Sequence, residues 1–210
     1  MFLTDAFMID ILTALFGSKA RVRILRLFLL NPDIQFTTTD IAMRTQITSV
    51  DVQREMRMAE RIAFVKVRRL KGRKHYRMND DFALRDQLMA LLTHATVTPE
   101  CQVLTQVAKI GEVHLALASG IFLNYTKARA DLFIVANDVS RARLMKWIKA
   151  LEAEMGREVR YVLLTMEEYK YRLNMTDRFL RDFLQGPYDE IINTIPHFKR
   201  TTNALKRRRV

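Results

Sequence analysis

Apolar side chains recur every three or four residues through the first sixty positions, which is the spacing of one face of a helix. The pattern predicts helices over residues 2–16, 19–30, 37–45 and 49–62. Ser18 can cap the second helix, and an Asn-Pro-Asp turn follows it. The third and fourth helices are joined by so short a turn that we expect them to pack as a pair.

A strand-like alternation of apolar and polar residues replaces the helical spacing at residues 64–70 and 75–79, which predicts two strands. Residues 71–74 between them include a glycine, so we expect a β-hairpin with these four residues as its tip. At the start of the preceding helix, Thr48 and Asp51 have the spacing of a capping box. The predicted order is therefore helix, helix, turn, helix and hairpin.

The second half of the chain has a different pattern, in which short strands alternate with helices. We expect a helix over 81–93, a linker over 96–100, strands over 113–118, 131–136 and 159–165, and a helix from Ser140 to Met155 that Gly156 ends. Thr165 and Glu168 form another capping box, and a helical finish follows that Gly186 and Pro187 break. Strands separated by a helix indicate a small α/β sheet domain.

The fold class predicted from these patterns is α+β with two domains. The first domain covers residues 1–95 and the second covers 101–195, followed by a basic tail over 196–210.

The formal charge of +12 is concentrated in two short segments. Residues 61–79 hold eight Lys or Arg and no acid, and residues 198–210 hold six and no acid. These segments supply +14, which leaves −2 for the rest of the chain. Clustered positive charge gains free energy by displacing the counterions condensed on phosphates, so the pattern favours nucleic acid as a partner over a membrane.

The remaining composition limits the other classes of protein. Cys101 is the single cysteine, which excludes an internal disulfide and a cysteine-rich zinc site. The four histidines have no ligand spacing among themselves, so no metal or other cofactor is expected. No apolar run reaches the roughly eighteen residues that span a bilayer, and Asp5 and Asp10 argue against a signal peptide. We expect a cytoplasmic protein.

The helix over residues 49–62 has one apolar side and one side suited to DNA. An arginine fork can donate two parallel hydrogen bonds to guanine O6 and N7, Val50 can contact a thymine methyl, and Gln53 can pair with adenine. Such helices enter the major groove by their N-terminal end, so Arg57 and Arg61 are expected to meet phosphate. The candidate DNA contacts on this helix are Thr48, Ser49, Val50, Gln53, Arg54, Arg57 and Arg61.

The predicted hairpin adds cations that can follow the DNA backbone or enter the minor groove. They are Lys66, Arg68, Arg69, Lys71, Arg73, Lys74 and Arg77. The alternative is a merely solvated helix face, but solvated faces usually mix charges of both signs, and this hairpin does not.

From these residues, the segment 18–79 resembles the winged-helix repressors of the ArsR type, with ITSVDVQREMRMAERIAFVKVRRLKGRKHYRMN as recognition helix and wing. The resemblance implies a dimeric transcription regulator that binds double-stranded DNA, and our hypothesis is that the helix over 2–16 forms the dimer. Ala63 stands where that family commonly has glycine, and the metal-sensing cysteines of some members are missing. Such domains also mediate protein contacts.

A Gly-Ser pair begins the phosphate site of nucleotidyltransferases of the DNA polymerase β type, and LFGSKAR contains one at Gly17 and Ser18. No Asp-x-Asp follows it, so we interpret LFGSKAR as a capped helix start. Residues 110–173 resemble the same fold more closely, with Ser119-Gly120 followed by Arg129-Ala130-Asp131.

In this second resemblance, Arg129 stands where the first metal-binding Asp belongs, Asp131 matches the second, and the strand with Arg160 has no carboxylate. It implies a transferase-like domain that has lost two-metal catalysis. Our hypothesis is an anion site, for a nucleotide without Mg²⁺, made of Ser119, Gly120, Arg129, Asp131 and Arg160. The alternative is that both arginines are exposed or paired with Asp131 and Glu158.

The sequence thus predicts a sequence-specific DNA-binding transcription regulator without catalytic residues, whose second domain serves dimerisation, partner contact or sensing of an anionic effector. Two alternatives stay open. One is an active nucleotidyltransferase whose winged helix recruits a nucleic-acid substrate, and the other is an adaptor whose winged helix binds protein.

Overall fold

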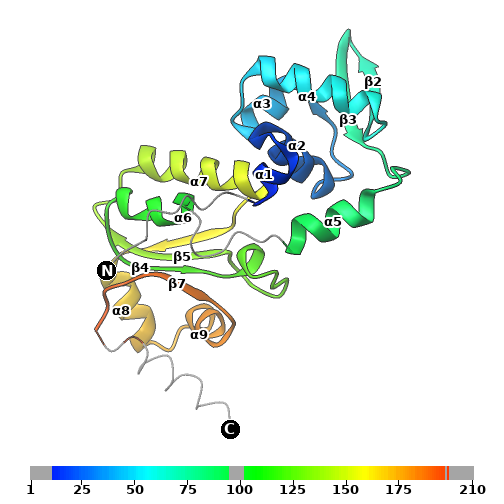
Figure 1. The fold of residues 1–210 in the computed structure, drawn as a ribbon. Coiled ribbons are helices and arrows are strands. Elements are labelled where there is room, and N and C mark those ends of the chain that lie inside the picture. Colours follow the sequence, from blue (N-terminus) through cyan, green and yellow to red (C-terminus); the bar gives the residue numbers. More distant parts are fainter. Residues whose placement is uncertain (1–10, 95–101, 197, 199–210) are drawn as a thin grey trace, which may run out of the picture. The chain divides into compact units, whose positions relative to one another are not determined.

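The computed structural model describes residues 11–94, 102–196 and 198, and its fold is α+β (Figure 1). The chain divides into two compact units. Unit 1 comprises Met1–Ala95 with Glu152–Arg157, and unit 2 comprises Thr96–Leu151 with Glu158–Val210. Our predictions for residues 2–10, for the linker over 96–100 and for most of the basic tail lie outside the described residues.

Unit 1 contains the predicted helices and hairpin together with a short additional strand. Its elements are α1 (Ile11–Phe16), α2 (Lys19–Leu29), β1 (Phe36–Thr37), α3 (Thr38–Thr45), α4 (Ser49–Arg61), β2 (Val65–Leu70), β3 (Arg73–Met78) and α5 (Arg85–His94). Ser18 caps α2 as expected, because its hydroxyl oxygen accepts a hydrogen bond from the Arg21 backbone N–H at 3.2 Å.

The core of unit 1 is built around Phe28 on α2, which is fully buried. Its ring meets Phe36 edge-on at 5.5 Å and Phe64 at 6.2 Å between centroids, and Phe64 in turn meets Phe82 at 5.4 Å. These aromatic contacts join α2 to β1, to the start of the hairpin and to the segment before α5.

Strand β1 was not predicted from the sequence. It pairs antiparallel with β3, so the sheet of unit 1 has three strands in the order β1-β3-β2. Two residues are too few to show alternation, and Thr37 also caps α3. A capping box forms there between Thr37 and Asp40, and the hydrogen bonds from Thr37 lower the pKa of Asp40.

The tip of the hairpin is shorter than predicted, with two residues instead of four. Leu70 pairs directly with Arg73, and only Lys71 and Gly72 lie between the strands. Both have positive φ, 48° and 76°, as a two-residue turn that matches the strand twist requires. The hairpin therefore carries its pairing to the end, and Arg73 lies on a strand.

The helix predicted over 81–93 begins later than expected, at Arg85. Asn79 delays it, because the Asn79 carbonyl accepts from the Phe82 N–H at 3.1 Å and its side-chain oxygen accepts from the Asp81 N–H at 3.2 Å. These bonds form a turn in place of the first helical turn.

Unit 2 is a four-stranded sheet with helices on both faces. Its elements are α6 (Gln102–Thr105), the 3₁₀ turns η1 (Gln106–Lys109) and η2 (Gly120–Phe122), β4 (Glu112–Ala118), β5 (Leu132–Asn137), α7 (Arg141–Met155) up to Leu151, β6 (Tyr161–Leu164), α8 (Met166–Asn174), α9 (Arg178–Gln185) and β7 (Asp189–Asn193). The strand order is β6-β5-β4-β7, with β5 and β6 parallel and the other pairs antiparallel. The predicted capping box between Thr165 and Glu168 starts α8.

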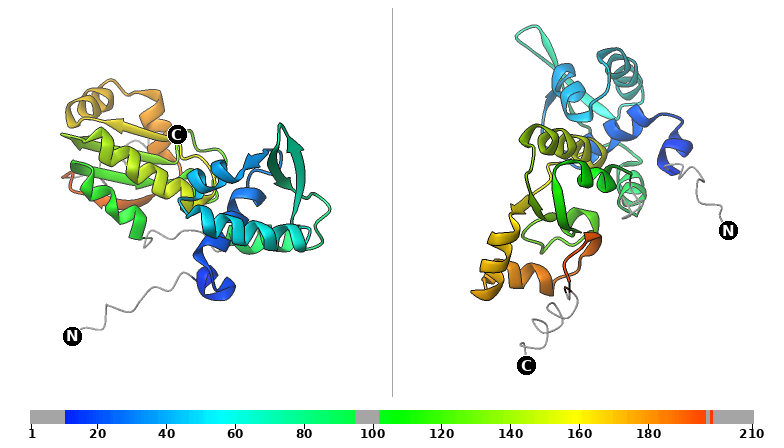
Figure 2. Two further views of the ribbon diagram at one scale, coloured as in Figure 1. Left: turned by 90° about the horizontal axis from the view of Figure 1, so that it is seen from above. Right: turned by 90° about the vertical axis from the view of Figure 1, so that its left-hand side faces the viewer.

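The helices of unit 2 form two layers, with α6 and α7 over one face of the sheet and α8 and α9 over the other (Figures 1 and 2). The side chains of β5 alternate between the two faces of the sheet, so successive residues face different helix layers. Phe133 and Val135 pack with Phe183 of α9 and its neighbours, in the layer of α8 and α9. The sequence did not predict β7, an edge strand whose half-exposed residues lack alternation.

Within the described parts of the chain, no helix is long and apolar enough to cross a membrane.

The junction between α4 and the hairpin generates a testable prediction. Ala63 has a φ of 56°, a left-handed conformation that a Cβ makes costly. Replacing Ala63 with glycine should stabilise unit 1 by about 0.5–1 kcal/mol, measured by urea denaturation followed by far-UV circular dichroism. The control is Ala90→Gly at an exposed position inside α5, which should destabilise by about 1 kcal/mol. Equal losses in the two variants would contradict a left-handed Ala63.

Candidate nucleic-acid interface

Helix α4 is held in place by its buried side. Val52, Met56 and Ala59 are buried in the core of unit 1. Glu55 lies on the same side, and its carboxylate accepts a hydrogen bond from Arg21 Nε of α2 at 2.9 Å. This role of Glu55 was not predicted from the sequence, although its place between Val52 and Ala59 on the apolar stripe was a signal. The opposite side of α4 is consequently turned to solvent.

All seven residues predicted to contact DNA on this helix are exposed, including the N-cap Thr48. Val50, an apolar residue, has 74% of its surface exposed. An exposed apolar side chain beside arginines at a helix start is suited to contact with a base edge.

Among the described contacts, Arg54 is the arginine of α4 that pairs with acids. Its Nη2 lies 2.7 Å from the Asp51 carboxylate and its Nε lies 3.6 Å from Glu55, yet 60% of its side chain remains exposed. The predicted capping box between Thr48 and Asp51 is wrong. The Asp51 carboxylate pairs with Arg54 and accepts from the Thr48 hydroxyl, where a capping box has it accept from the Thr48 backbone N–H. Of that box, only the hydrogen bond from the Asp51 N–H to the Thr48 hydroxyl oxygen (3.2 Å) is present among the described contacts.

A left-handed turn joins α4 to the hairpin. The Phe64 N–H donates to the Ala59 carbonyl at 2.9 Å and the Ala63 N–H donates to the Glu60 carbonyl at 3.1 Å, which is the Schellman pattern. Asn79 closes the base of the hairpin through its side-chain amide, which donates to the Ala63 carbonyl at 2.7 Å. The hairpin therefore stands beside α4 (Figure 1).

Three of the seven hairpin cations are paired with acids of unit 1. Lys66 lies 2.7 Å from Asp81, and this contact lowers the pKa of that carboxyl. Lys74 contacts Glu60 of α4 at 3.0 Å. Arg77 contacts Asp33 and Asp80 and also donates to the Pro32 carbonyl at 3.1 Å. These side chains help to hold the hairpin in place.

Six of the predicted DNA contacts are exposed cations that have no acid within ion-pair distance in the described part of the chain. They are Arg57, Arg61, Arg68, Arg69, Lys71 and Arg73. We call them the unpaired cations.

The unpaired cations occupy α4, the hairpin tip and both faces of the hairpin. Arg69 pairs across the strands with Lys74, on the face that contacts Glu60 of α4. Arg68 and Arg73 belong to the opposite face, because successive side chains alternate along a strand. The hairpin can therefore present positive charge to a polyanion on either side.

In unit 2, the predicted anion site is divided into two separate ion pairs. Asp131 is fully buried, and Arg160 binds it through Nε at 3.1 Å and Nη2 at 3.0 Å. These hydrogen bonds raise the pKa of Arg160. Arg129 instead pairs with Asp182 on α9 at 3.1 Å, a partner that nothing in the sequence indicated.

Ser119 and Gly120 have structural contacts. The Ser119 hydroxyl donates to the Pro187 carbonyl at 2.7 Å. Gly120 has a φ of 53°, and a Cβ there would lie 2.0 Å from Asp131 Oδ1, so the carboxylate occupies the space that a side chain would need.

A magnesium site does not fit the residues around Asp131. Its Oδ1 also accepts from the Ile121 N–H at 3.1 Å and its Oδ2 from the Arg160 N–H at 2.9 Å, so protein donors use both oxygens. Across the described residues, no group of three or more His, Cys, Asp or Glu is arranged to hold a metal ion.

Comparisons with protein-family models, curated proteins and solved structures found no match to this chain.

The contact between Arg160 and Asp131 predicts a stability effect. Arg160→Met leaves the buried carboxylate without its cation and should destabilise unit 2 by about 1–3 kcal/mol, less than for a fully buried pair because 55% of the Arg160 side chain is exposed and two backbone N–H donors remain. The double variant Asp131→Asn/Arg160→Met removes both charges and should lose less. Urea denaturation followed by the fluorescence of Trp147, which is buried on α7 of the same unit, measures both. Equal losses in the single and double variants would show that the Asp131 carboxylate costs nothing without its cation, which would contradict this prediction.

Proposed function

We propose that the chain is a sequence-specific, double-stranded DNA-binding transcription regulator that acts in the cytoplasm. In this proposal, unit 1 is a winged helix domain of the ArsR type, with α4 as recognition helix and the hairpin as wing. Unit 2 is a nucleotidyltransferase-like domain with a non-catalytic role. The observation that carries the proposal is the set of six unpaired cations on α4 and the hairpin.

The charge distribution supports a polyanionic partner. Like charges that lie close together repel one another, so a cluster without acids stabilises nothing in the free protein. Against a duplex, the same cations displace condensed counterions and gain binding free energy. The other three cations of the hairpin differ from this cluster, because each forms an ion pair with an acid of unit 1. They are Lys66, Lys74 and Arg77.

Arg54 is the residue proposed to read a base. The Asp51 carboxylate holds its guanidinium at the exposed surface near the start of α4. A fixed orientation suits a bidentate contact with guanine, because less side-chain entropy is lost on binding. Asp51 also repels phosphate, so a weak non-specific affinity accompanies this arrangement.

A homodimer is part of the proposal. Ile11 and Leu15 lie four residues apart on α1, and 77% and 64% of their surfaces are exposed. Apolar side chains at this spacing on one helix face are suited to pack against a second copy. A monomer in static light scattering at working concentration would contradict it.

Nucleotidyl transfer is not favoured, because Arg160 and backbone donors engage the carboxylate at the position of a metal ligand. A metal-dependent transfer reaction lost on Asp131→Ala would show the enzyme alternative.

Binding of a random-sequence duplex at several salt concentrations tests the main proposal. Arg68→Gln should weaken binding and lower the slope of log K against log salt by about 0.9, the loss of one phosphate contact. Lys66→Gln is the matched control, because it removes one charge from the same strand and face, but Asp81 already pairs with that charge. Its effect should be smaller. Little affinity and little salt slope in the parent protein would instead favour the adaptor.

Base reading is tested with the preferred site selected from random duplexes. Arg54→Ala should cost about 1–3 kcal/mol on the preferred site and less on other sequences. Asp51→Asn should tighten binding to all sequences and reduce the discrimination among them, because it removes a negative charge and frees the Arg54 guanidinium. Fluorescence anisotropy on matched and mismatched duplexes measures both. If Arg54→Ala weakens every sequence equally, the arginine contacts phosphate and our assignment is wrong.

A further inference from the structure

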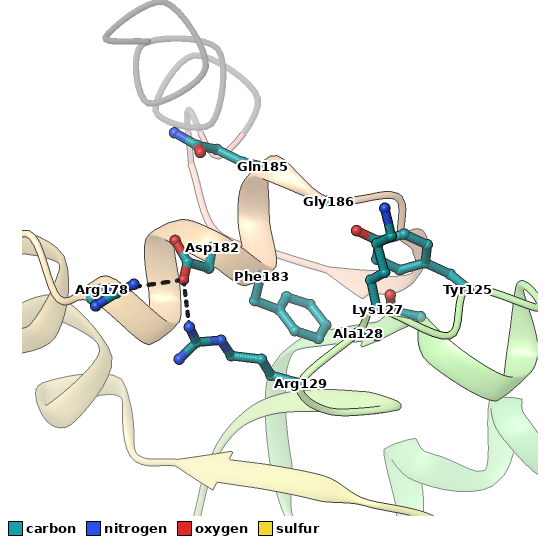
Figure 3. Close-up of a pocket in the computed structure, with 10 residues that line it drawn as sticks. Tyr125, Lys127, Ala128, Arg129, Arg178, Asp182, Phe183, Gln185 and Gly186 are labelled. Atoms are coloured by element: carbon teal, nitrogen blue, oxygen red, sulfur yellow. Dashed lines mark ion pairs between the residues drawn. The ribbon is translucent and has the colours of Figure 1, made fainter.

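Unit 2 contains a cavity of about 360 Å³ between the loop that follows η2 and helix α9. Six of the residues that line it have charged or aromatic side chains: Tyr125, Lys127, Arg129, Arg178, Asp182 and Phe183. The side chains of these residues surround one hollow, with Arg129 and Arg178 directed at Asp182 and Lys127 beside Tyr125 (Figure 3).

The charges around the cavity do not balance. Asp182 is the acid among its lining residues, and its carboxylate lies 3.1 Å from Arg129 and 3.8 Å from Arg178. The same carboxylate lies 4.0 Å from Arg181 of α9. Lys127 has no ion pair within the described residues. The lining therefore carries an excess of two positive charges over one shared carboxylate, before Arg181 is counted.

The loop that supplies Lys127 and Arg129 has a fixed backbone. The Tyr125 N–H donates to the Gly120 carbonyl at 2.8 Å, and the Ala128 N–H donates to the Tyr125 carbonyl at 3.3 Å. On the other side, Phe183 is buried and its ring packs 5.3 Å from Phe133 in the core. The cationic groups thus extend from a rigid base.

The excess charge and the rings together indicate the kind of ligand. Two positive charges match a dianion, and guanidinium and ammonium groups are strong donors to phosphate oxygens. Tyr125 and Phe183 add aromatic surface to the same cavity, whose volume is within the range of small-molecule sites.

We propose that this cavity binds a small phosphate monoester whose remainder is flat or apolar, with Arg129 and Arg178 on the phosphate and Lys127 as a further positive charge on the other side of Phe183 (Figure 3). The site shares Arg129 and the lining residue Ser119 with the predicted anion site, but Asp131 and Arg160 take no part in it. Asp182 holds the arginines in the free protein and competes with the phosphate for them. The inference concerns unit 2 alone and does not rest on DNA binding.

The experiment titrates phenyl phosphate into the full chain by isothermal calorimetry with EDTA present. Saturable binding is expected, and the double variant Lys127→Gln/Arg129→Gln should weaken it by about tenfold or more, since two positive charges are lost. Asp182→Asn should tighten it, because the competing carboxylate is removed. Trp147 fluorescence checks that each variant remains folded.

Two comparisons make the result specific. The matched control Arg68→Gln/Arg73→Gln removes the same number of charges from the hairpin and should leave the affinity unchanged. Phenol, which lacks the phosphate, should not bind. The proposal is overturned by absence of saturable binding, by equal binding of phenol, by an unchanged affinity in the Lys127/Arg129 variant, or by an equal loss in the hairpin control.

Discussion

The candidate interface depends on one left-handed residue, Ala63, at the end of α4. Its conformation lets the Phe64 and Ala63 N–H groups satisfy the last carbonyls of the helix while Phe64 turns into the core. The chain then continues into the hairpin. The Asn79 side chain, just after the second strand, donates a hydrogen bond to the Ala63 carbonyl, just before the first. Together with the contact between Lys74 and Glu60, this turn sets the orientation of the hairpin relative to α4.

The two units differ in whether their cationic side chains are paired with acids. On α4 and the hairpin, Arg68 and Arg73 represent cations that have no acid partner within the described residues, and they remain exposed. In unit 2, the two arginines predicted to form an anion site are paired with acids, Arg160 with Asp131 and Arg129 with Asp182. The first arrangement suits a large polyanion bound at the surface. The second leaves a limited excess of charge around one cavity, which suits a small anion.

The sequence was most informative where the determinants are local. The helices of unit 1 follow from apolar spacing and from caps such as Ser18, which act within a few residues. Strand β1 was missed because its partner β3 lies some forty residues away and only that pairing makes it a strand. The partner of Arg129 was missed for the same reason, since the fold alone brings Asp182 to it. For Glu55, the apolar stripe on α4 was a usable signal.

The most direct measurement of the central claim is hydrogen–deuterium exchange of the full chain with and without a double-stranded DNA fragment. We expect slower exchange with DNA at the start of α4 and at the hairpin tip around Gly72, both in unit 1. Those segments contain the exposed N-cap and the exposed two-residue turn. Binding of DNA with protection confined to other segments, or no binding at all, would contradict it.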